Sequence, residues 1–285
     1  MRLRLELAYD GTDFHGWAAQ KDPQLRTVEG ELTRILELVL REPITLTVAG
    51  RTDAGVHALG QVAHLDVSQA ALEQRSLDGQ PERLVRRIAK LTPSDIVVRA
   101  CTEAPAGFDA RFSALRRRYR YRVTTALSGP APTRARDTAS YAKPVDLQRM
   151  NQAAEQLTGL NDFAAFCRAK PNATTIRDLQ EFSWRDISTP TEPSLYEATV
   201  VADAFCWSMV RSLVGCCLAV GEGRRTTEFA ASLLAQSTRS SAIPVAPARG
   251  LTLLGVEYPP DAELAHRADS TRAKRHPGML DGGGC

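Results

Sequence analysis

Cysteine and histidine are scarce in this sequence, and they do not fall into a pattern that holds a metal. The 285 residues include six cysteines and five histidines. No two cysteines form a C-x-x-C pair, which excludes a zinc site built on closely spaced cysteines. We therefore expect no zinc site of that kind. Because nothing in the composition points to secretion, we also expect a reducing, cytoplasmic setting.

Long apolar runs are also missing. The most apolar helical segment, VGCCLAVG, is far too short to span a bilayer. The first residues, MRLRLELAYD, alternate charged residues with leucine and contain no apolar stretch typical of a signal peptide. We therefore expect no association with a membrane.

Charge is nearly balanced overall, but arginine is concentrated in one region. Hydrophobic residues make up 43% of the chain and charged residues 24%, with a formal net charge of +3. This composition is sufficient for an ordinary buried core. Between residues 106 and 136 the sequence has eight arginines and one acid, Asp109. A block of this kind is typical of a surface that binds phosphate groups.

Hydrophobic periodicity divides the chain into two halves with the same order of elements, β-α-β-β-α-β. The first half covers residues 1–106 and the second residues 107–259, whereas residues 260–285 lack periodicity and are expected to be disordered. The predicted strands are 2–9, 44–49, 61–67, 95–101, 118–125, 176–187, 195–204 and 251–258. The predicted helices are 28–40, 81–91, 146–157 and 207–220, the last extended by 227–236.

This element order is typical of ferredoxin-like folds, a group that includes the RRM domain. We expect an α+β protein made of two such halves, with largely antiparallel sheets side by side and a central catalytic cleft. Thr27 is expected to cap the first long helix. In the segment YDGTDFHGW, Phe14 and Trp17 are expected to close the core.

The stretch AGRTDAGVHA places Asp53 among residues too small to cover it. A turn in which Asp53 bonds to its own backbone would explain the pattern. A metal site would use Asp53, His57, His64 and Asp66, but these residues lack the compact spacing of known zinc sites. A nucleophilic carboxylate is the third interpretation, and it requires a nearby cation to stay ionised in a desolvated cleft.

Arg211 is the candidate for that cation. In FCWSMVRSLVG the apolar residues follow a helical stripe, and Arg211 lies at the edge of this stripe. An arginine in this place can pack its stem on the core and extend its charge to solvent. Alternatively, its guanidinium is held at the core boundary to pair with an anion, for which Asp53 is the candidate.

The segment FDARFSALRRRYRYRV combines tyrosine and arginine. In a strand, Tyr119 and Tyr121 lie on one face, and Arg118, Arg120 and Arg122 on the other. Such a strand can simply present a basic surface above an aromatic core face. Aromatic residues interleaved with arginine are also how proteins hold unstacked bases against a phosphate backbone.

Six blocks of the sequence occur in the order found in the TruA family of tRNA pseudouridine synthases. They are YDGTDFHGW, GRTDAGVHA, FDARFSA with RRYRY, NDFAAF, MVRSLVG and APARGLTL. The chain resembles this family over roughly residues 3 to 258, and GRTDAGVHA is a specific signature. Two positions depart from the usual pattern, since Ala18 replaces a common glutamine and Ser208 a common histidine.

The resemblance implies a role for four residues. Asp53 matches the catalytic aspartate, and Arg211 matches the arginine that pairs with it. Tyr119 matches the tyrosine that stacks on the target base and is a proposed proton acceptor. Arg51 matches the arginine thought to fill the space left by the flipped uridine. We further expect Arg116, Arg117 and His57 to bind the substrate.

The family is homodimeric, uses neither metal nor cofactor, and acts on uridines of the tRNA anticodon stem-loop, at family target positions 38–40. The resemblance therefore implies a cytoplasmic isomerase that flips a uridine and attacks the nucleoside with an aspartate. A non-catalytic RNA-binding protein with two RRM-like halves is the alternative, although the RNP1 aromatic pattern is missing. A metal-dependent nuclease is a second alternative.

Overall fold

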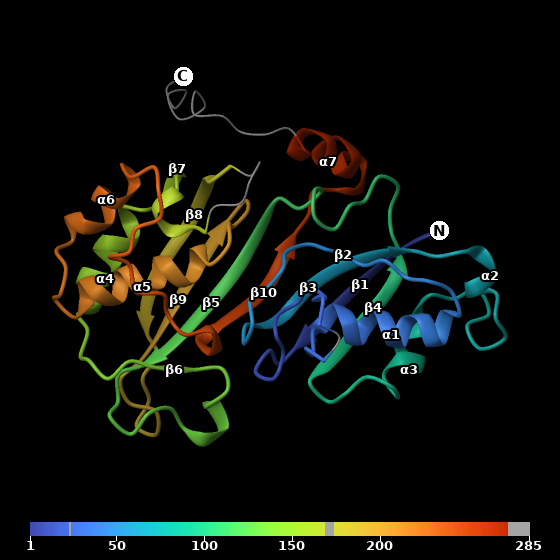
Figure 1. The fold of residues 1–285 in the computed structure, drawn as a ribbon, viewed down its shortest axis with the longest axis horizontal. Coiled ribbons are helices and arrows are strands. Elements are labelled where there is room, and N and C mark those ends of the chain that lie inside the picture. The colour runs from blue at the N-terminus through green and yellow to red at the C-terminus, as the bar shows by residue number, and fades with distance from the viewer. Residues whose placement is uncertain (23, 169–173, 273–285) are drawn as a thin grey trace. The chain divides into compact units, whose positions relative to one another are not determined.

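The computed structural model describes residues 1–22, 24–168 and 174–272, which divide into two compact units (Figure 1). The first unit combines Met1–Leu115 with Leu253–Arg272, and the second contains Arg116–Thr252. Both are built from helices and mostly antiparallel strands, so the predicted α+β class is confirmed. The first unit extends past residue 106 and takes in a segment that is distant in sequence.

The strands of the first unit follow the ferredoxin-like order β4-β1-β3, with β2 beside β3 and β10 on the far side of β3. The pairs β1–β3, β1–β4 and β2–β3 are antiparallel. The strands are β1 (Arg2–Tyr9), β2 (Thr47–Val48), β3 (His57–Asp66), β4 (Ile96–Glu103) and β10 (Leu251–Glu257). The first two residues of β10 belong to the second unit, whereas the prediction placed the whole strand there.

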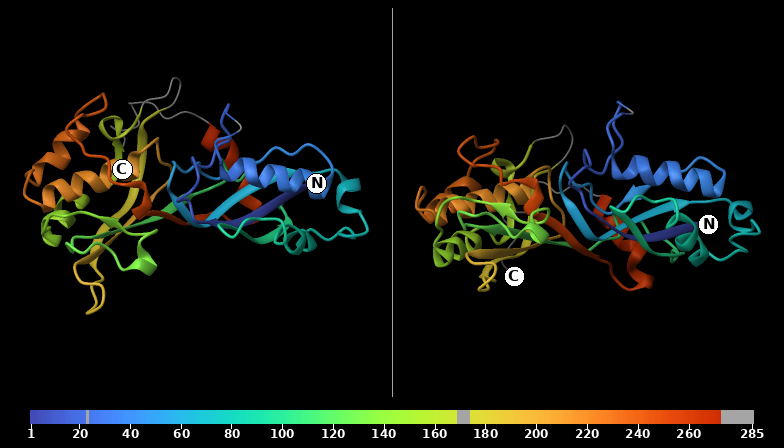
Figure 2. Two further views of the ribbon diagram at one scale, coloured as in Figure 1. Left: turned by 60° about the horizontal axis from the view of Figure 1, so that its bottom comes forward. Right: turned by 90° about the horizontal axis from the view of Figure 1, so that it is seen from below.

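Helix α1 (Val28–Leu40) covers one face of these strands (Figure 2). Thr27 caps it as predicted, because its side chain accepts a hydrogen bond from the Gly30 N–H. Phe14 and Trp17 are buried in the core, which confirms that prediction too. The remaining helices before β4 are short, α2 (Gln69–Leu72) and α3 (Glu82–Ile88).

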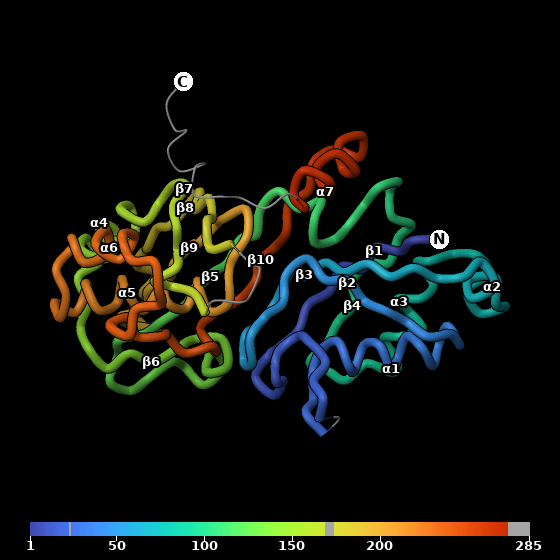
Figure 3. The backbone as a smooth tube through the Cα atoms, turned by 45° about the horizontal axis from the view of Figure 1, so that its top comes forward, coloured from blue at the N-terminus to red at the C-terminus, as the bar shows by residue number. Residues whose placement is uncertain are grey.

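A further helix lies in the segment that was expected to be disordered. The short turn η4 (Asp261–Glu263) leads into α7 (Leu264–Arg272), which lies beside the connection from β4 to β5 (Figure 3). The Ser113 hydroxyl donates to the Leu264 carbonyl at 3.1 Å, and Leu264 is buried. The prediction is therefore wrong for residues 261–272, since a few apolar contacts order a segment without periodicity. Residues 273–285 lie outside the described part of the chain.

The second unit has the strand order β5-β9-β8-β7, with the short β6 parallel to β5. Helices α4 and α5 pack against each other, and α6 is a separate helix rather than an extension of α5. The strands are β5 (Arg116–Thr124), β6 (Ala139–Ser140), β7 (Gly159–Asp162), β8 (Ile176–Asp186) and β9 (Leu195–Ala202). The helices are α4 (Leu147–Glu155), α5 (Met209–Gly221) and α6 (Glu228–Leu234), with short turns η1 (Pro132–Arg134), η2 (Ala164–Phe166) and η3 (Ala248–Gly250).

Burial alternates along β5 as the sequence predicted, with both tyrosines buried and Arg118, Arg120 and Arg122 on the more exposed face. These three arginines are paired within the unit. Arg118 pairs with Glu181 at 2.9 Å, and Arg122 pairs with Glu197 at 2.8 Å. Arg120 and Arg122 also each lie 3.3 Å from Asp137. The local count of charges missed these acids because Glu181 and Glu197 come from other strands and Asp137 lies just beyond the counted range.

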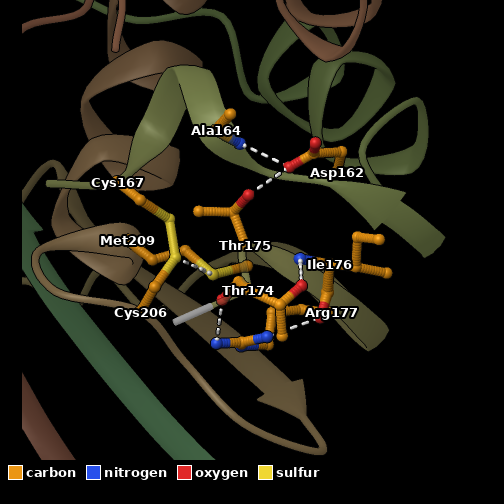
Figure 4. The surroundings of a disulfide bond; sticks show 9 residues. All are labelled: Asp162, Ala164, Cys167, Thr174, Thr175, Ile176, Arg177, Cys206 and Met209. Carbon is orange, nitrogen blue, oxygen red and sulfur yellow. Dashed lines mark hydrogen bonds between the residues drawn. A yellow bond between two sulfur atoms is a disulfide. The ribbon is translucent and has the colours of Figure 1, made fainter. Parts of the chain in front are cut away.

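Cys167 and Cys206 are joined by a disulfide (Figure 4). The bond links the end of η2 to the residues that precede α5. Nearby, the Asp162 carboxylate accepts hydrogen bonds from the Ala164 N–H at 3.0 Å and from the Thr175 hydroxyl. We expected a reducing setting from the sequence and therefore did not predict this bond.

In the described ranges, no helix combines the length and the apolar character that crossing a membrane requires.

The buried carboxylate of Glu197 gives a test of the charge network on β5. Glu197 is 4% exposed, and its carboxylate accepts hydrogen bonds from Arg122 and Arg185. The Nε of Arg185 lies 3.0 Å from the Glu197 Oε1. Glu197→Gln removes the buried negative charge that faces Arg122 and Arg185, and Asp137 remains beside Arg122. We expect the free energy of unfolding, measured by urea denaturation, to fall by about 3 kcal/mol.

Glu181→Gln is the matched control, because this acid also pairs with a β5 arginine but both side chains are about 40% exposed. We expect a loss below about 1 kcal/mol for this variant. Equal losses in the two variants would show that burial does not set the strength of this network.

Candidate active site

Asp53 lies at the start of a tight turn between β2 and β3. The Val56 N–H donates to the Asp53 carbonyl at 3.1 Å, which closes a four-residue turn over Asp53–Val56. Gly55, at the third position, has a φ of 76°, a conformation that favours glycine. A turn, one of the three interpretations of this stretch, is therefore present, and it is closed by the Asp53 carbonyl.

The loop that follows β1 packs directly against this turn. The Trp17 N–H donates to the Thr52 carbonyl at 3.0 Å, and the Gly55 N–H donates to the Phe14 carbonyl at 3.3 Å. Gly16 has a φ of 96°, and a Cβ at this position would lie 2.9 Å from the Thr52 carbonyl oxygen. Any larger residue at position 16 would therefore push against the backbone that carries Asp53.

A buried polar network holds the residue before Asp53. The hydroxyls of Tyr9 and Thr52 are hydrogen-bonded at 2.8 Å, and the Gln61 amide donates to the Tyr9 oxygen and to the Gly50 carbonyl. Burial raises the pKa of Tyr9 to about 12, although its hydrogen bonds oppose the rise. Tyr9 therefore remains protonated at neutral pH and acts as a fixed support for the turn.

His57 occupies a structural position at the start of β3. It is 5% exposed, and its Nδ1 accepts a hydrogen bond from the Gly11 N–H at 3.0 Å. The Asp10 carboxylate lies 3.1 Å from the same nitrogen and would become its partner if the ring were protonated. The hydrogen bond from Gly11 fixes the loop after β1, so this position favours support of the turn over direct contact with substrate.

The metal interpretation of this region requires side chains that have other partners. His64 Nδ1 accepts from the Ala110 N–H at 3.0 Å, and Asp66 pairs with Arg2 at 2.8 Å. Within the described residues, no group of three or more His, Cys, Asp or Glu side chains is arranged to hold a metal ion.

The two departures from the family pattern both lie where a backbone segment turns. Ala18 sits in the loop after β1, and the side chain of Gln20 in the same loop donates to the His15 carbonyl at 3.0 Å. Ser208 precedes α5 with a φ of 65°, in the left-handed region. Ser208 thus takes a conformation that residues other than glycine rarely adopt, directly before the helix that carries Arg211.

Tyr119 lies in the middle of β5, opposite Val200 of β9. Its ring meets the edge of the Phe205 ring, with centroids 5.1 Å apart and planes at 88°. Edge-to-face contacts of this kind orient aromatic rings. Phe205 was missed by the sequence analysis, although it stands in the quoted segment FCWSMVRSLVG.

Arg211 lies in the first turn of α5 and is anchored to the segment before β10. Its Nε donates to the Ala246 carbonyl at 2.7 Å, and the Ala246 N–H donates back to the Arg211 carbonyl at 3.0 Å. The residue is partly buried, as its place at the edge of the apolar stripe predicted. These bonds fix the direction of the side chain, which a simple surface arginine would not need.

Tyr121 and Arg249 complete the surroundings of Arg211. The Tyr121 hydroxyl donates to the Pro247 carbonyl at 3.0 Å. Burial raises the pKa of Tyr121 well above its usual range, and the positive charges of Arg211 and Arg249 partly oppose the rise. The second unit thus gathers two arginines near a buried tyrosine. Arg249, in the block APARGLTL, was not singled out from the sequence.

The other predicted RNA-binding arginines differ in their surroundings. Arg51 is exposed, two residues before Asp53, and Arg116 is partly buried at the start of β5. Arg117 is 7% exposed, and its guanidinium donates to the Asp203 carbonyl at 2.5 Å. Its side chain is therefore used inside the second unit, on the same face of the strand as the tyrosines.

The structure thus sorts the predicted residues into two groups. Asp53, Arg51 and His57 lie on one loop of the first unit. Tyr119, with Phe205 against it, and Arg211, with Tyr121 near it, belong to the second unit. Each group is held by contacts inside its own unit.

Comparison with known proteins places the chain in a family. The sequence profile of a family described as tRNA pseudouridine synthase matches residues 7–113 and 153–259. The tRNA pseudouridine synthase A of Corynebacterium glutamicum is 62% identical over 275 residues, covering 96% of this chain and 95% of that protein. The proteins of the same name from Mycobacterium leprae and Leifsonia xyli are 50% and 49% identical, covering 96% of this chain and 96% and 97% of their own lengths. The family inferred from the sequence motifs is confirmed: the chain belongs to the TruA family of tRNA pseudouridine synthases.

Proposed function

We propose that this protein isomerises uridine to pseudouridine in the anticodon stem-loop of tRNA. The observation that carries the proposal is the Asp53 turn, whose backbone is fixed by the loop after β1 and by the Tyr9 network. This turn lies inside the region that matches the family. Small residues beside Asp53 let a flipped nucleotide approach the carboxylate closely.

The proposed reaction rearranges one substrate and needs no oxidant or reductant. A uridine leaves the helical stack and its base stacks on Tyr119. Asp53 then acts on the nucleoside, by attack at the ribose C1′ or as a base towards a glycal, and the bond between C1′ and N1 breaks. The detached base rotates, C5 bonds to C1′, the C5 proton is lost and N1 gains a proton. Tyr119 is the proposed proton acceptor.

The guanidinium of Arg211 is proposed to pair with the Asp53 carboxylate. An opposite charge favours the ionised form of a carboxyl group in a desolvated site. The bonds from Arg211 to Ala246 support this role, because they hold the side chain in one direction. We also propose that Arg51 fills the place of the flipped base and that Arg116 contacts the RNA backbone. An RNA contact is not proposed for Arg117, whose guanidinium binds Asp203.

We further propose a cytoplasmic homodimer, as in the family that the chain resembles. The rival function is RNA binding without catalysis, which the fold alone would permit. A nuclease would shorten the RNA and lose activity with a chelator, whereas an isomerase should do neither.

Asp53→Asn tests the catalytic role of the carboxylate while keeping the size of the side chain. We expect release of tritium from C5-labelled uridine in unmodified tRNA to fall by about 10³-fold or more. The affinity for tRNA, measured by filter binding, should change by less than about threefold, because the acid acts on the bond-breaking step.

Asp78→Asn is the control, because Asp78 is an exposed acid of the same unit that pairs with Arg83. It should keep the wild-type rate. No tritium release by the folded wild-type protein would favour RNA binding alone. A large loss of tRNA affinity in Asp53→Asn would assign the residue a structural role.

Arg211 is tested with two substitutions that separate charge from shape. Arg211→Met should lower turnover by about 10²-fold or more, because the carboxylate loses its counterion. Arg211→Lys should restore only a minor part of the rate, since lysine cannot reproduce the planar fork that also binds Ala246. Single-turnover rates at saturating protein measure this effect.

Arg225→Met is the matched control, since Arg225 is exposed beyond α5 and its guanidinium stacks on Phe229. Wild-type turnover in Arg211→Met would contradict the proposed pairing. Full rescue by lysine would show that charge alone suffices.

A further inference from the structure

A tryptophan and an arginine lie stacked on the surface next to the disulfide. The guanidinium carbon of Arg168 lies 4.7 Å from the centre of the Trp207 ring. Trp207 is 44% exposed, which is unusual for so large an apolar side chain. Arg168 is also exposed, so the pair presents an aromatic ring and a positive charge together.

The pair is held in place by the backbone as well as by stacking. The Arg168 N–H donates to the Trp207 carbonyl at 3.1 Å, and the residues just before them, Cys167 and Cys206, form the disulfide. The Met209 N–H also donates to the Cys206 carbonyl at 3.0 Å. The backbone bond between Arg168 and Trp207 therefore restricts both side chains, which lowers the entropy lost when a ligand binds.

The same short segment reaches the proposed base-stacking residue. Phe205, two positions before Trp207, packs its edge on Tyr119. Two residues span at most about 7 Å along an extended chain. Trp207 thus lies close in the chain to the residue that orients Tyr119, all within the second unit.

We propose that Trp207 and Arg168 form a second stacking site, which takes an unpaired base of the anticodon loop near the flipped uridine. Aromatic rings and arginine planes hold unstacked RNA bases in this way, and the arginine adds attraction to the phosphate backbone. The inference rests on the proposed function, because it requires a tRNA substrate. It adds a residue pair that neither the motifs nor the catalytic roles use.

Tryptophan fluorescence can report on this site directly. The chain has three tryptophans, and the other two, Trp17 and Trp184, are 0% and 4% exposed. A base that stacks on Trp207 should quench its emission when the full-length protein is titrated with unmodified tRNA. The quenching should persist in Trp184→Phe and disappear in Trp207→Leu.

Affinity gives the second measurement. Trp207→Leu should weaken tRNA binding by about 5- to 150-fold, the range for one base stacked on an aromatic ring. Trp207→Phe should recover most of the affinity, because phenylalanine keeps an aromatic face. Thermal unfolding of each variant shows that the protein remains folded.

A double-mutant cycle, which combines Trp207→Leu with the loss of one RNA base, identifies the base that stacks on Trp207. A series of tRNAs is assembled from synthetic halves, and each tRNA in the series has a single abasic site at a different position of the anticodon loop. At one position, loss of the base and Trp207→Leu should be non-additive, since both remove the same contact. Additive losses at every position, unchanged emission at saturating tRNA, or wild-type affinity in Trp207→Leu would each overturn the proposal.

The two proposals fail in different ways. If the wild-type protein forms pseudouridine but its Trp207 emission does not change when tRNA is added, the proposed activity stands and the proposed stacking site is contradicted. Quenching with the expected non-additivity, but without any pseudouridine, would support the stacking site and contradict the proposed reaction.

Discussion

The close approach of two loops in the first unit is the constraint on which the proposed chemistry depends. The turn that begins with Asp53 cannot hold its position alone, because it joins a two-residue strand to β3. The loop after β1 supplies the missing support through Trp17 and Phe14, and Gly16 leaves room for it. The proposed catalytic acid is thus positioned by backbone contacts from residues about 40 positions earlier in the sequence.

In the second unit, ion pairs rather than backbone contacts between loops support the strand that carries Tyr119. Most arginines of β5 are matched by acids, so the strand is a rigid support rather than an unpaired basic surface. The side chains for which we propose a role in catalysis or RNA binding have their directions fixed by other contacts. Tyr119 is oriented by Phe205, Arg211 by Ala246, and Trp207 by the linked segment that contains Cys206. In each case a neighbouring residue restricts a side chain that could otherwise adopt several rotamers.

Much of the fold follows from local pattern, because strands and helices of strong periodicity were predicted with the correct type and order. A turn at Asp53 was one of three interpretations of its glycine-rich surroundings, and local pattern alone could not decide among them. What the pattern missed depends on tertiary partners: the acids that pair with β5, the burial of Arg117 against Asp203, and the helix α7 that packs on Ser113. The Cys167–Cys206 bond was missed for the same reason, because spacing does not show which cysteines meet.

The rate of a Gly16→Ala variant tests the central claim most directly. Alanine at position 16 would strain a φ of 96° and place its Cβ 2.9 Å from the Thr52 oxygen, whereas Gly79 has a φ of 71° with nothing within 4 Å. Gly79→Ala therefore controls for backbone strain alone. Under single-turnover conditions with saturating protein, Gly16→Ala should form pseudouridine at least about tenfold more slowly than Gly79→Ala, because small displacements of a catalytic group cost this much or more. Equal rates in the two folded variants would contradict the claim that this loop contact positions Asp53 for catalysis.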